Sequence, residues 1–434
     1  MHWTVKRSGI IAPDERLPWG PQIVLALQHA AAMFGSTVVA PLIMGFPPTT
    51  ALFFSGVATL IFFVVTWGKV PSYLGSSFAF IAPVLAVTGG HGSISEALGG
   101  IVAAGVVYAI IGLLVHVLGS AWIEYLMPPV VTGSVVIVIG LTLAGAAKNL
   151  AAADVVAAIL TILAIFAVGL YTRGLLSRLP ILLGTALGYL LTLALGGTSG
   201  RTYGPLHIGG VDLSPIGKAA WLGLPTFTTP TFSWHAIALL VPVVVVLIAE
   251  NTGHVKAVGA ITGRDLDPYL GRSFLGDGIA TIVSGSFGGT GVTTYAENIG
   301  TLAVSKTYST LLFPMAAVVA LLLGICPKFG ALLQTIPSGV LGGASTVLFG
   351  LIAATGVRIL IQNDVDLSRV LNLLTVGTGV VLAAGGYDLV FGAFDVGNLT
   401  VSAIGVILLY LIFRHAPSAT LVERDLLADA VPGS

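Results

Sequence analysis

The chain has 434 residues, of which 56% are hydrophobic and only 8% are charged, with a mean hydropathy of +1.01 and a formal net charge of zero. This composition lies outside the range of soluble globular proteins and indicates a polytopic membrane protein. No basic patch of the kind that binds nucleic acid is visible, so we expect no nucleic-acid partner. The single cysteine, Cys326, excludes an internal disulfide and a cysteine metal cluster.

The N-terminal segment, residues 1–20, carries Lys6, Arg7 and Arg16 but has neither a signal-peptide core nor a cleavage site. We therefore expect it to stay in the cytoplasm. The polar tail from Arg414 to Ser434 is expected to be disordered and also cytoplasmic.

Between these termini, about fourteen apolar runs are each long enough, or nearly so, to cross a hydrocarbon core. The first seven lie at about 22–43, 49–67, 71–87, 97–118, 128–146, 155–171 and 181–195. A polar Gly/Pro-rich loop near 196–233 separates them from runs at about 236–258, 273–287, 290–304, 307–325, 339–354, 370–384 and 399–413.

The distribution of Lys and Arg supports this count and gives an orientation. With the N-terminus inside and fourteen spans, fourteen of the eighteen basic residues fall in cytoplasmic segments. Lys148, Arg201, Lys218 and Lys328 fall outside. Because cytoplasmic loops of membrane proteins are enriched in Lys and Arg, we predict an even number of spans with both termini in the cytoplasm.

A weak internal symmetry suggests two halves of similar construction. The motif MPPVVTG at Met127–Gly133 resembles IPSGVLGG at Ile336–Gly343, and the runs at 71–87 and 290–304 are both short and interrupted. Such a pair of broken segments is the best sequence indication of a transporter's midplane site, and an odd number of spans per repeat inverts the second copy. Coincidence between low-complexity apolar segments is the alternative.

Glycine accumulates where the second broken run should open. Gly285, Gly288, Gly289 and Gly291 precede Tyr295. Non-helical backbone at membrane depth is tolerated where it is buried in protein or lines a wet cavity, although close helix packing would also require small residues. Residues 292–295, and Phe78 and Phe80 with their neighbours, are β-prone, so two short extended pieces could pair across the midplane.

Two acidic side chains, Glu250 and Glu297, lie in this apolar setting, where an ionisable group is costly and usually functional. The first of them, Glu250, lies four residues before His254, so the two share a helix face. The pair admits three interpretations: zinc ligands, a structural hydrogen bond, or a proton-transfer pair. No HExxH motif or second histidine cluster is present, so we expect no metal site.

Glu297 follows the predicted break in the second broken run. A carboxylate there can accept N–H bonds from a planar ligand, while the freed backbone N–H groups donate to the ligand's carbonyls. This pattern complements an imide such as uracil, and Phe78 and Tyr295 could supply a flat apolar wall. Asp277 is a secondary candidate, and His29 is expected to form a hydrogen bond with a neighbouring helix.

Several motifs together resemble those of one transporter family. TTYAENIGTLAVSK at Thr293–Lys306 is similar to the signature of the nucleobase–ascorbate transporters, also called nucleobase:cation symporter-2. Glu297, Asn298, Gly300 and Lys306 fit the signature, while Ser305 stands where Thr is usual. AENTGH at 249–254, PSYLGSSFAF at 71–80 and QHAAAMFG at 28–35 resemble the uracil permeases of this family. APDERLP and GRDLDPYLGRSF resemble the branch that serves pyrimidine utilisation.

The resemblance implies an all-α polytopic membrane protein with fourteen spans in two inverted seven-span repeats, and short β-strands in the third and tenth spans. It also implies a core domain that binds substrate, at 21–120 and 233–326, and a gate domain at 121–196 and 327–413. Residues 197–232 would form an extracytoplasmic loop. Members of the family commonly act as homodimers in proton-coupled uptake across the cytoplasmic membrane, without a cofactor.

Carried over by position, the resemblance assigns roles to individual residues. Glu250 and Glu297 would hydrogen-bond the base, main-chain N–H groups at Phe78 and Ala296 would donate to its carbonyls, and His254 would link to proton coupling. The expected substrate-binding, proton-coupling and supporting residues are Glu250, Glu297, Phe78, Ala296, Tyr295, His254, Asn298, Ser77 and Ser36. Ala296 stands where uracil permeases often have Gly, and its methyl group would narrow the pocket.

The predicted function is proton-coupled import of uracil, with thymine as a related substrate. A purine symporter of the xanthine type remains an alternative, because purine-transporting relatives often have Gln at the Glu297 position. An anion exchanger of related architecture is a more distant alternative, since its site should offer cations or donors without two carboxylates. We expect no enzymatic activity, because the sequence shows neither a nucleophile with a positioned base nor a metal site.

Overall fold

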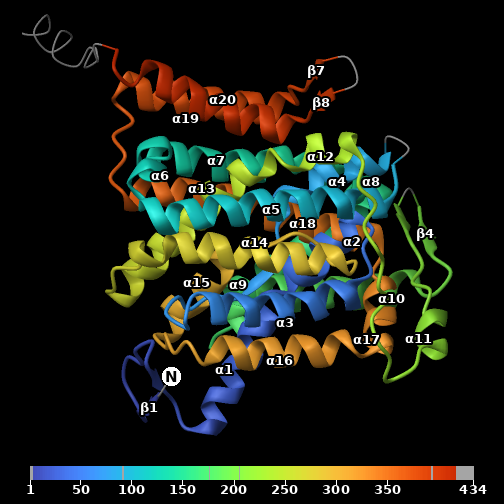
Figure 1. The fold of residues 1–434 in the computed structure, drawn as a ribbon. Helices are drawn as coiled ribbons and strands as arrows, with labels where there is room; N and C mark the ends of the chain where they lie inside the picture. Colours follow the sequence, from blue (N-terminus) through green and yellow to red (C-terminus); the bar gives the residue numbers. More distant parts are fainter. Residues whose placement is uncertain (1–2, 90–91, 175, 205, 392–393, 417–434) are drawn as a thin grey trace, which may run out of the picture.

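The computed structural model describes residues 3–89, 92–174, 176–204, 206–391 and 394–416. Residues 417–434, most of the tail that is expected to be disordered, lie outside the described residues. The described chain is a bundle of helices that run side by side, with short strands near the two ends and one strand pair inside (Figure 1).

The first half contains α1 (Trp19–Ala32), η1 (Gly35–Val39), α2 (Ala40–Met44), α3 (Pro48–Val65), η2 (Phe78–Phe80), α4 (Ile81–Gly89), α5 (Ile94–Leu118), α6 (Ala121–Leu126), α7 (Pro129–Thr142), α8 (Ala144–Ala153), α9 (Val155–Tyr171), η3 (Leu176–Arg178) and α10 (Pro180–Gly196). The second half contains α11 (Ser214–Lys218), α12 (Trp234–Leu240), α13 (Val243–Thr262), η4 (Asp267–Tyr269), α14 (Leu270–Ser286), α15 (Ala296–Ser305), α16 (Leu312–Gly324), α17 (Pro327–Gln334), α18 (Ser338–Gln362), α19 (Val370–Gly385) and α20 (Asn398–Phe413). The strands are β1 (Thr4–Val5), β2 (Glu15–Arg16), β3 (Leu74–Ser76), β4 (Arg201–Tyr203), β5 (Leu206–Ile208), β6 (Val292–Thr294), β7 (Leu389–Phe391) and β8 (Phe394–Val396).

Each apolar run expected from the sequence contains at least one of these helices. Among the described residues, five helices are long and apolar enough to cross a membrane, or up to seven if each of two bent helix pairs is one span. Five more apolar helices are shorter, at 10–17 residues. The mostly helical architecture of a membrane protein is therefore confirmed, whereas the count of fourteen spans, the inverted repeats and the core and gate boundaries stay predictions.

One end of the bundle collects the N-terminal segment and the end of α20. Arg264, after α13, pairs with Asp14 at 2.5 Å, and the guanidinium of Arg414, after α20, donates to the carbonyl of Tyr125 in α6 at 2.8 Å. Figure 1 shows the N-terminus, α6 and the α20 end on the left side of the bundle. The termini of the described chain thus lie at the same end of the helices, and their location in the cytoplasm stays a prediction.

The opposite end carries the long loop between the two halves. This loop is not featureless, because β4 and β5 form an antiparallel hairpin and α11 follows it. The Asp154 carboxylate at the start of α9 accepts a hydrogen bond from the backbone N–H of Gly209 at 2.6 Å, and the backbone N–H of Lys328 donates to Ala220 at 2.9 Å. The loop is therefore fastened to α9 and α17.

Helices α5 and α14 pack with their backbones in direct approach. A Cβ added at Gly112 would lie 2.3 Å from the backbone nitrogen of Leu275, and one at Gly278 would lie 2.4 Å from that of Ala109. Such distances exclude any side chain, so glycine is required on both helices at these crossings. Most of α14 is buried, and its partly exposed residues, including Leu275, Ile279 and Ile282, form a single stripe along the helix.

The predicted strands in the two broken segments are present and pair with each other. β3 and β6 form a two-stranded antiparallel sheet in which Leu74 faces Thr294 and Ser76 faces Val292. All six residues are buried. The expectation that Phe78 belongs to the extended piece is wrong, because Ser77 caps a short helix that begins at Phe78, its hydroxyl accepting from the N–H of Ala79 at 3.3 Å.

Candidate substrate site

The crossing of β3 and β6 depends on glycine at close approaches. A Cβ at Gly75 would lie 2.5 Å from the Ser36 hydroxyl, and one at Gly291 would lie 2.2 Å from the ring of Phe80. Beyond the strands, the N–H of Ser77 donates to the carbonyl of Gly291 at 2.8 Å. The two broken segments are thereby locked together, and the glycine cluster before Tyr295 serves a backbone break rather than helix packing alone.

The crossing leaves two helix N-termini close to the paired strands. η2 begins at Phe78 and α15 begins at Ala296, each directly after extended backbone. The first N–H groups of a helix have no acceptor within the helix and carry its positive dipole end. Donation from the main-chain groups of Phe78 and Ala296 to a ligand's carbonyl oxygen stays a prediction, with which these positions are compatible.

Glu250 and His254 occupy buried positions in the middle of α13, each with 6% of its surface exposed. His254 forms its hydrogen bond through Nδ1 with the Thr294 hydroxyl at 3.0 Å, which ties α13 to the end of β6. The interpretation of Glu250 and His254 as a structural hydrogen-bonded pair is wrong, because His254 bonds to Thr294 instead. The Oε2 atom of Glu250 is buried without a hydrogen-bond partner among the described residues.

Glu297 lies in the first turn of α15 and is only partly buried. Helix α15 packs against α13, the helix that carries Glu250. Asn298, the residue after Glu297, is 1% exposed, and its Oδ1 forms a hydrogen bond with Nδ1 of His29 from α1. The predicted hydrogen bond of His29 with a neighbouring helix is confirmed, and it holds the start of α15 against α1.

Phe78 and Tyr295, the two rings expected to supply a flat apolar wall, pack against each other edge to face. Their ring centroids are 5.3 Å apart, and the Tyr295 hydroxyl donates to the backbone carbonyl of Ser76 in β3. A third ring, Phe349 of α18, lies 5.8 Å from Phe78. Sequence reasoning missed Phe349, because nothing in the apolar run of α18 distinguishes it from an ordinary packing residue.

Behind β6 lies a second polar cluster. The Asp277 carboxylate, fully buried on α14, accepts from the Asn251 side-chain amide at 2.5 Å and from the Thr293 hydroxyl at 3.1 Å. Asn251 is the neighbour of Glu250, and Thr293 is part of β6. Asp277 therefore fixes both elements that carry the site. Its position near the start of an apolar run was the only sequence signal for it.

The supporting residue Ser36 lies in η1, a π-helical turn, and its hydroxyl donates to the carbonyl of Met33 at 3.0 Å. π-helical turns are rare and recur at functional sites. Gln28 of α1 is only part of a sequence motif, with no role predicted for it. Its side chain is 3% exposed, and neither Oε1 nor Nε2 has a hydrogen-bond partner among the described residues.

A cavity of about 400 Å³ lies beside these residues, between α13 and α15 on one side and α7 and α18 on the other. His254 and Ala296 line it, whereas Glu250, Glu297, Phe78 and Tyr295 do not. Lys256 and Arg358 also line it. The cavity thus reaches the edge of the candidate site from the end of the bundle that carries Lys256. Within the described ranges, no three His, Cys, Asp or Glu residues are grouped so that they could hold a metal ion.

Paired strands at two helix breaks, with carboxylates beside them in an apolar bundle, define a membrane transport protein. Solved structures of other transporters share this fold, among them the following two. The mouse Solute Carrier 26 member A9 anion transporter, in its inward-facing state, has a TM-score of 0.65 at 9% identity and covers 91% of this chain and 68% of its own. The cyanobacterial bicarbonate transporter BicA has a TM-score of 0.59 at 15% identity and covers 91% of this chain and 97% of its own transmembrane domain.

Sequence relatives identify the particular family. Residues 20–390 match the model of a xanthine and uracil permease family, described as "Permease family". The chain is 52% identical to the "Putative pyrimidine permease RutG" of Escherichia coli over 94% of both chains. It is 40% identical to the uracil permease of Paenibacillus larvae over 94% of this chain and 97% of that one. The chain belongs to the nucleobase:cation symporter-2 family, in its uracil and pyrimidine permease branch. These relatives are named as permeases, which supports a nucleobase transporter rather than an enzyme.

Proposed function

We propose that the protein is a proton-coupled symporter that imports uracil, and the related pyrimidine thymine, across the cytoplasmic membrane by alternating access. The observation that carries this proposal is that α13, which carries Glu250, packs against α15, which carries Glu297 in its first turn, and against β6 and η2. Carboxylates can accept hydrogen bonds from the N–H groups of an imide, and backbone N–H groups can donate to its carbonyl oxygens, so together they match the alternating groups along its edge.

In this proposal the carboxylates of Glu250 and Glu297 accept the two ring N–H groups of uracil. The main-chain N–H groups of Phe78 and Ala296 donate to its carbonyl oxygens. Glu250 suits this role because its Oε2 atom is buried and has no partner among the described residues, which is costly unless a ligand or proton supplies one. The Phe78 and Tyr295 rings, 5.3 Å apart, bound the site with apolar surface.

The need for a proton follows from charge. A neutral base cannot offset carboxylate charge in an apolar bundle, whereas a proton bound at the same cluster can. We assign the coupling proton to the cluster formed by Glu250, Glu297 and His254. His254 is bonded to Thr294, so its protonation would act on β6 as well as on the charge near Glu250. Binding of base and proton together would then favour movement of the loaded site.

The cavity beside the site supports an inward-open path. It is lined by Lys256 and Arg358 and ends at His254 and Ala296. Because basic residues favour the cytoplasmic side, this path leads to the cytoplasm. Phe349 of α18 lies 5.8 Å from Phe78, so α18 would close over the site as the predicted gate and core domains move relative to each other.

Inorganic anions and xanthine-type purines are two other substrate classes that fit the site less well than a pyrimidine. The shared fold with anion transporters favours an anion exchanger, but two acidic side chains beside the crossing disfavour an anionic substrate. A xanthine-type purine is larger than uracil, and the Ala296 methyl group stands at the end of the cavity, which favours a pyrimidine. We also propose that the protein acts as a homodimer, as members of this family commonly do.

The test is uptake of labelled uracil into proteoliposomes with an imposed inward proton gradient, with and without a protonophore. We expect gradient-dependent accumulation that unlabelled thymine inhibits more strongly than xanthine, and no flux of chloride, sulfate or bicarbonate. Glu297→Ala should abolish uracil binding, whereas Asp212→Ala, which removes an exposed carboxylate from the loop at the opposite end, should bind normally. Accumulation that ignores the gradient would remove the proton from the mechanism.

A further inference from the structure

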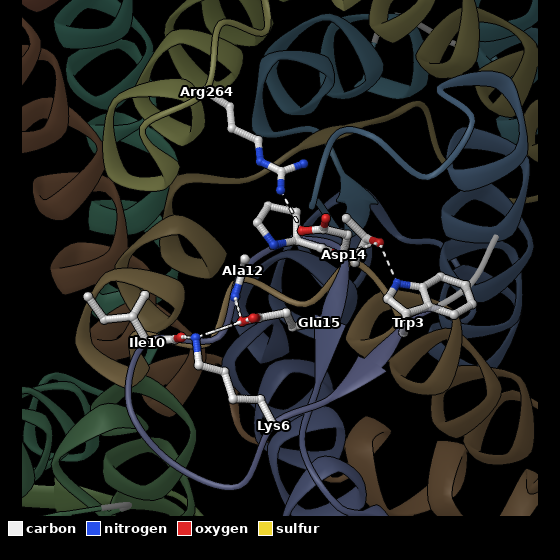
Figure 2. A network of polar contacts seen from close by, with 9 residues as sticks. Trp3, Lys6, Ile10, Ala12, Asp14, Glu15 and Arg264 are labelled. Carbon is white, nitrogen blue, oxygen red and sulfur yellow. Dashed lines mark hydrogen bonds and ion pairs between the residues drawn. The ribbon is translucent and has the colours of Figure 1, made fainter.

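The N-terminal segment 3–18 forms a self-contained strap on the end of the bundle. β1 and β2 pair in parallel, so the strap closes on itself as a loop. The Glu15 carboxylate accepts from the Ala12 N–H at 2.9 Å and from the Lys6 ammonium at 3.0 Å (Figure 2). These internal contacts give the strap a fixed shape, although it lies outside every apolar run.

The strap is bonded mainly to the chain that follows α15. The N–H of Ile11 donates to the carbonyl of Lys306 at 3.0 Å, and the N–H of Tyr308 donates back to Ile11 at 2.8 Å. The N–H of Thr310 donates to Pro13 at 3.0 Å. The Ile11 side chain is 1% exposed, so this junction also buries apolar surface. It is a continuous backbone seam rather than a surface contact.

Two further contacts fasten the strap to other helices. The Trp3 indole N–H donates to the Thr310 hydroxyl at 3.1 Å, and its ring stacks on Phe63 of α3 at 6.3 Å. Asp14 pairs with Arg264 between α13 and α14 at 2.5 Å (Figure 2). The strap therefore links the end of α15 to α3 and to the α13–α14 loop, which are elements of the predicted core domain.

The last turn of α15 is largely exposed, at Ala303, Val304 and Lys306, although Leu302 before it is buried. The helix has only ten residues and carries Glu297 in its first turn. The cavity lies along one side of it, where Ile299, Gly300 and Ala303 are lining residues. It ends at Lys306 in a left-handed conformation with φ 50°, and the strap's first bond is to that same residue.

We propose that the strap is a positioning element for substrate binding, which holds the end of α15 and thereby sets the position of Glu297. Resting on the proposed function, this inference adds a segment far from the site in sequence to the determinants of uracil affinity. Ile11 is its central residue, because its main chain makes both bonds to 306–308 and its side chain is buried there. Loss of the strap should therefore weaken binding without preventing movement of the loaded site.

The test compares Ile11→Ala with the conservative Ile11→Val and with Val5→Ala, whose residue lies in the same strap but is 53% exposed. Uracil binding, the KM and maximal rate of uptake, and amide hydrogen exchange would be measured on the full-length protein in nanodiscs or proteoliposomes. For Ile11→Ala we expect the uracil Kd and KM to rise about tenfold, because weakening one hydrogen bond between the Glu297 carboxylate and the base costs roughly that much affinity. The maximal rate should stay within about twofold, and exchange should quicken at residues 296–310. Ile11→Val and Val5→Ala should match the wild type.

Since Ile11→Ala could impair folding, Trp3→Phe provides a second variant that keeps the stack on Phe63 but removes the N–H to Thr310. An unchanged Kd in both variants would overturn the inference, as would faster exchange spread evenly over the whole bundle. If the wild type fails to bind uracil, the proposed function fails by itself. The strap's hold on α15 would then be judged by the exchange of residues 296–310 alone.

Discussion

Gly291 provides the sharpest test of the crossed-strand site. In Gly291→Ala, the new Cβ would lie 2.2 Å from the Phe80 ring, where an ordinary contact needs at least 3.4 Å. Phe80 is fully buried, so its ring has no space into which to turn. The strand must therefore shift by about 1 Å, and β6 leads directly into Ala296 and Glu297.

A displacement of this size that breaks one hydrogen bond between the Glu297 carboxylate and the base would cost about 1.5–3 kcal/mol of uracil binding free energy, which corresponds to roughly 10- to 10²-fold in Kd. Overpacking should also lower the free energy of unfolding by about 1–3 kcal/mol. The measurement is uracil titration by calorimetry together with the apparent Tm of the purified protein. Gly377→Ala on α19 is the matched control, because its Cβ meets no atom within 4 Å. Wild-type affinity in Gly291→Ala would refute the assignment of the crossing to the substrate site.

Three further outcomes are expected. Glu250→Gln keeps the shape of the side chain but cannot release a proton, so uracil exchange should persist while accumulation driven by a pH gradient is lost; accumulation at the wild-type level would contradict this. Asp277→Ala leaves two buried donors unpaired and should cost about 2–6 kcal/mol at about 1–3 per group, seen as a lower apparent Tm, whereas exposed Asp212→Ala should change it little. The pKa of Asp14 lies below its usual value of 3.8 because its own backbone N–H, and then Arg264, stabilise the carboxylate. The Asp14 contribution is therefore present above pH 3.8 and lost as the pH falls through the lowered pKa, and hydrogen exchange of the strap should quicken only in that acid window.

Much of the site was predictable because membrane burial makes polar residues conspicuous. Glu250, His254 and Glu297 stand out in apolar runs, and β-prone residues beside glycines indicated the paired strands. The end of the first strand was misplaced, because the capping hydroxyl of Ser77 starts a helix that propensity alone does not reveal. The roles assigned to these residues stay predictions of the proposed mechanism.

Contacts between distant segments could not be predicted from the sequence. The bond of His254 to Thr294 depends on where β6 crosses α13, and the helical face shared with Glu250 suggested a different partner. The strap was recognised only as a basic N-terminal segment, because its docking joins Ile11 to Thr307. The network around Asp277 likewise joins three elements whose relative placement no local pattern encodes.

The close fit of α14 against α5 has a consequence for how the chain is made. Helix α14 carries Asp277 and several hydroxyl groups at buried positions, and only a narrow stripe of partly buried residues, including Leu275, Ile279 and Ile282, is left for contact with lipid. During synthesis it would enter the bilayer poorly as a single segment. Its groove on α5, shaped by Gly105 and Gly112, is translated long before it. We therefore expect a fixed order of membrane insertion, in which α5 inserts first and α14 then inserts against it.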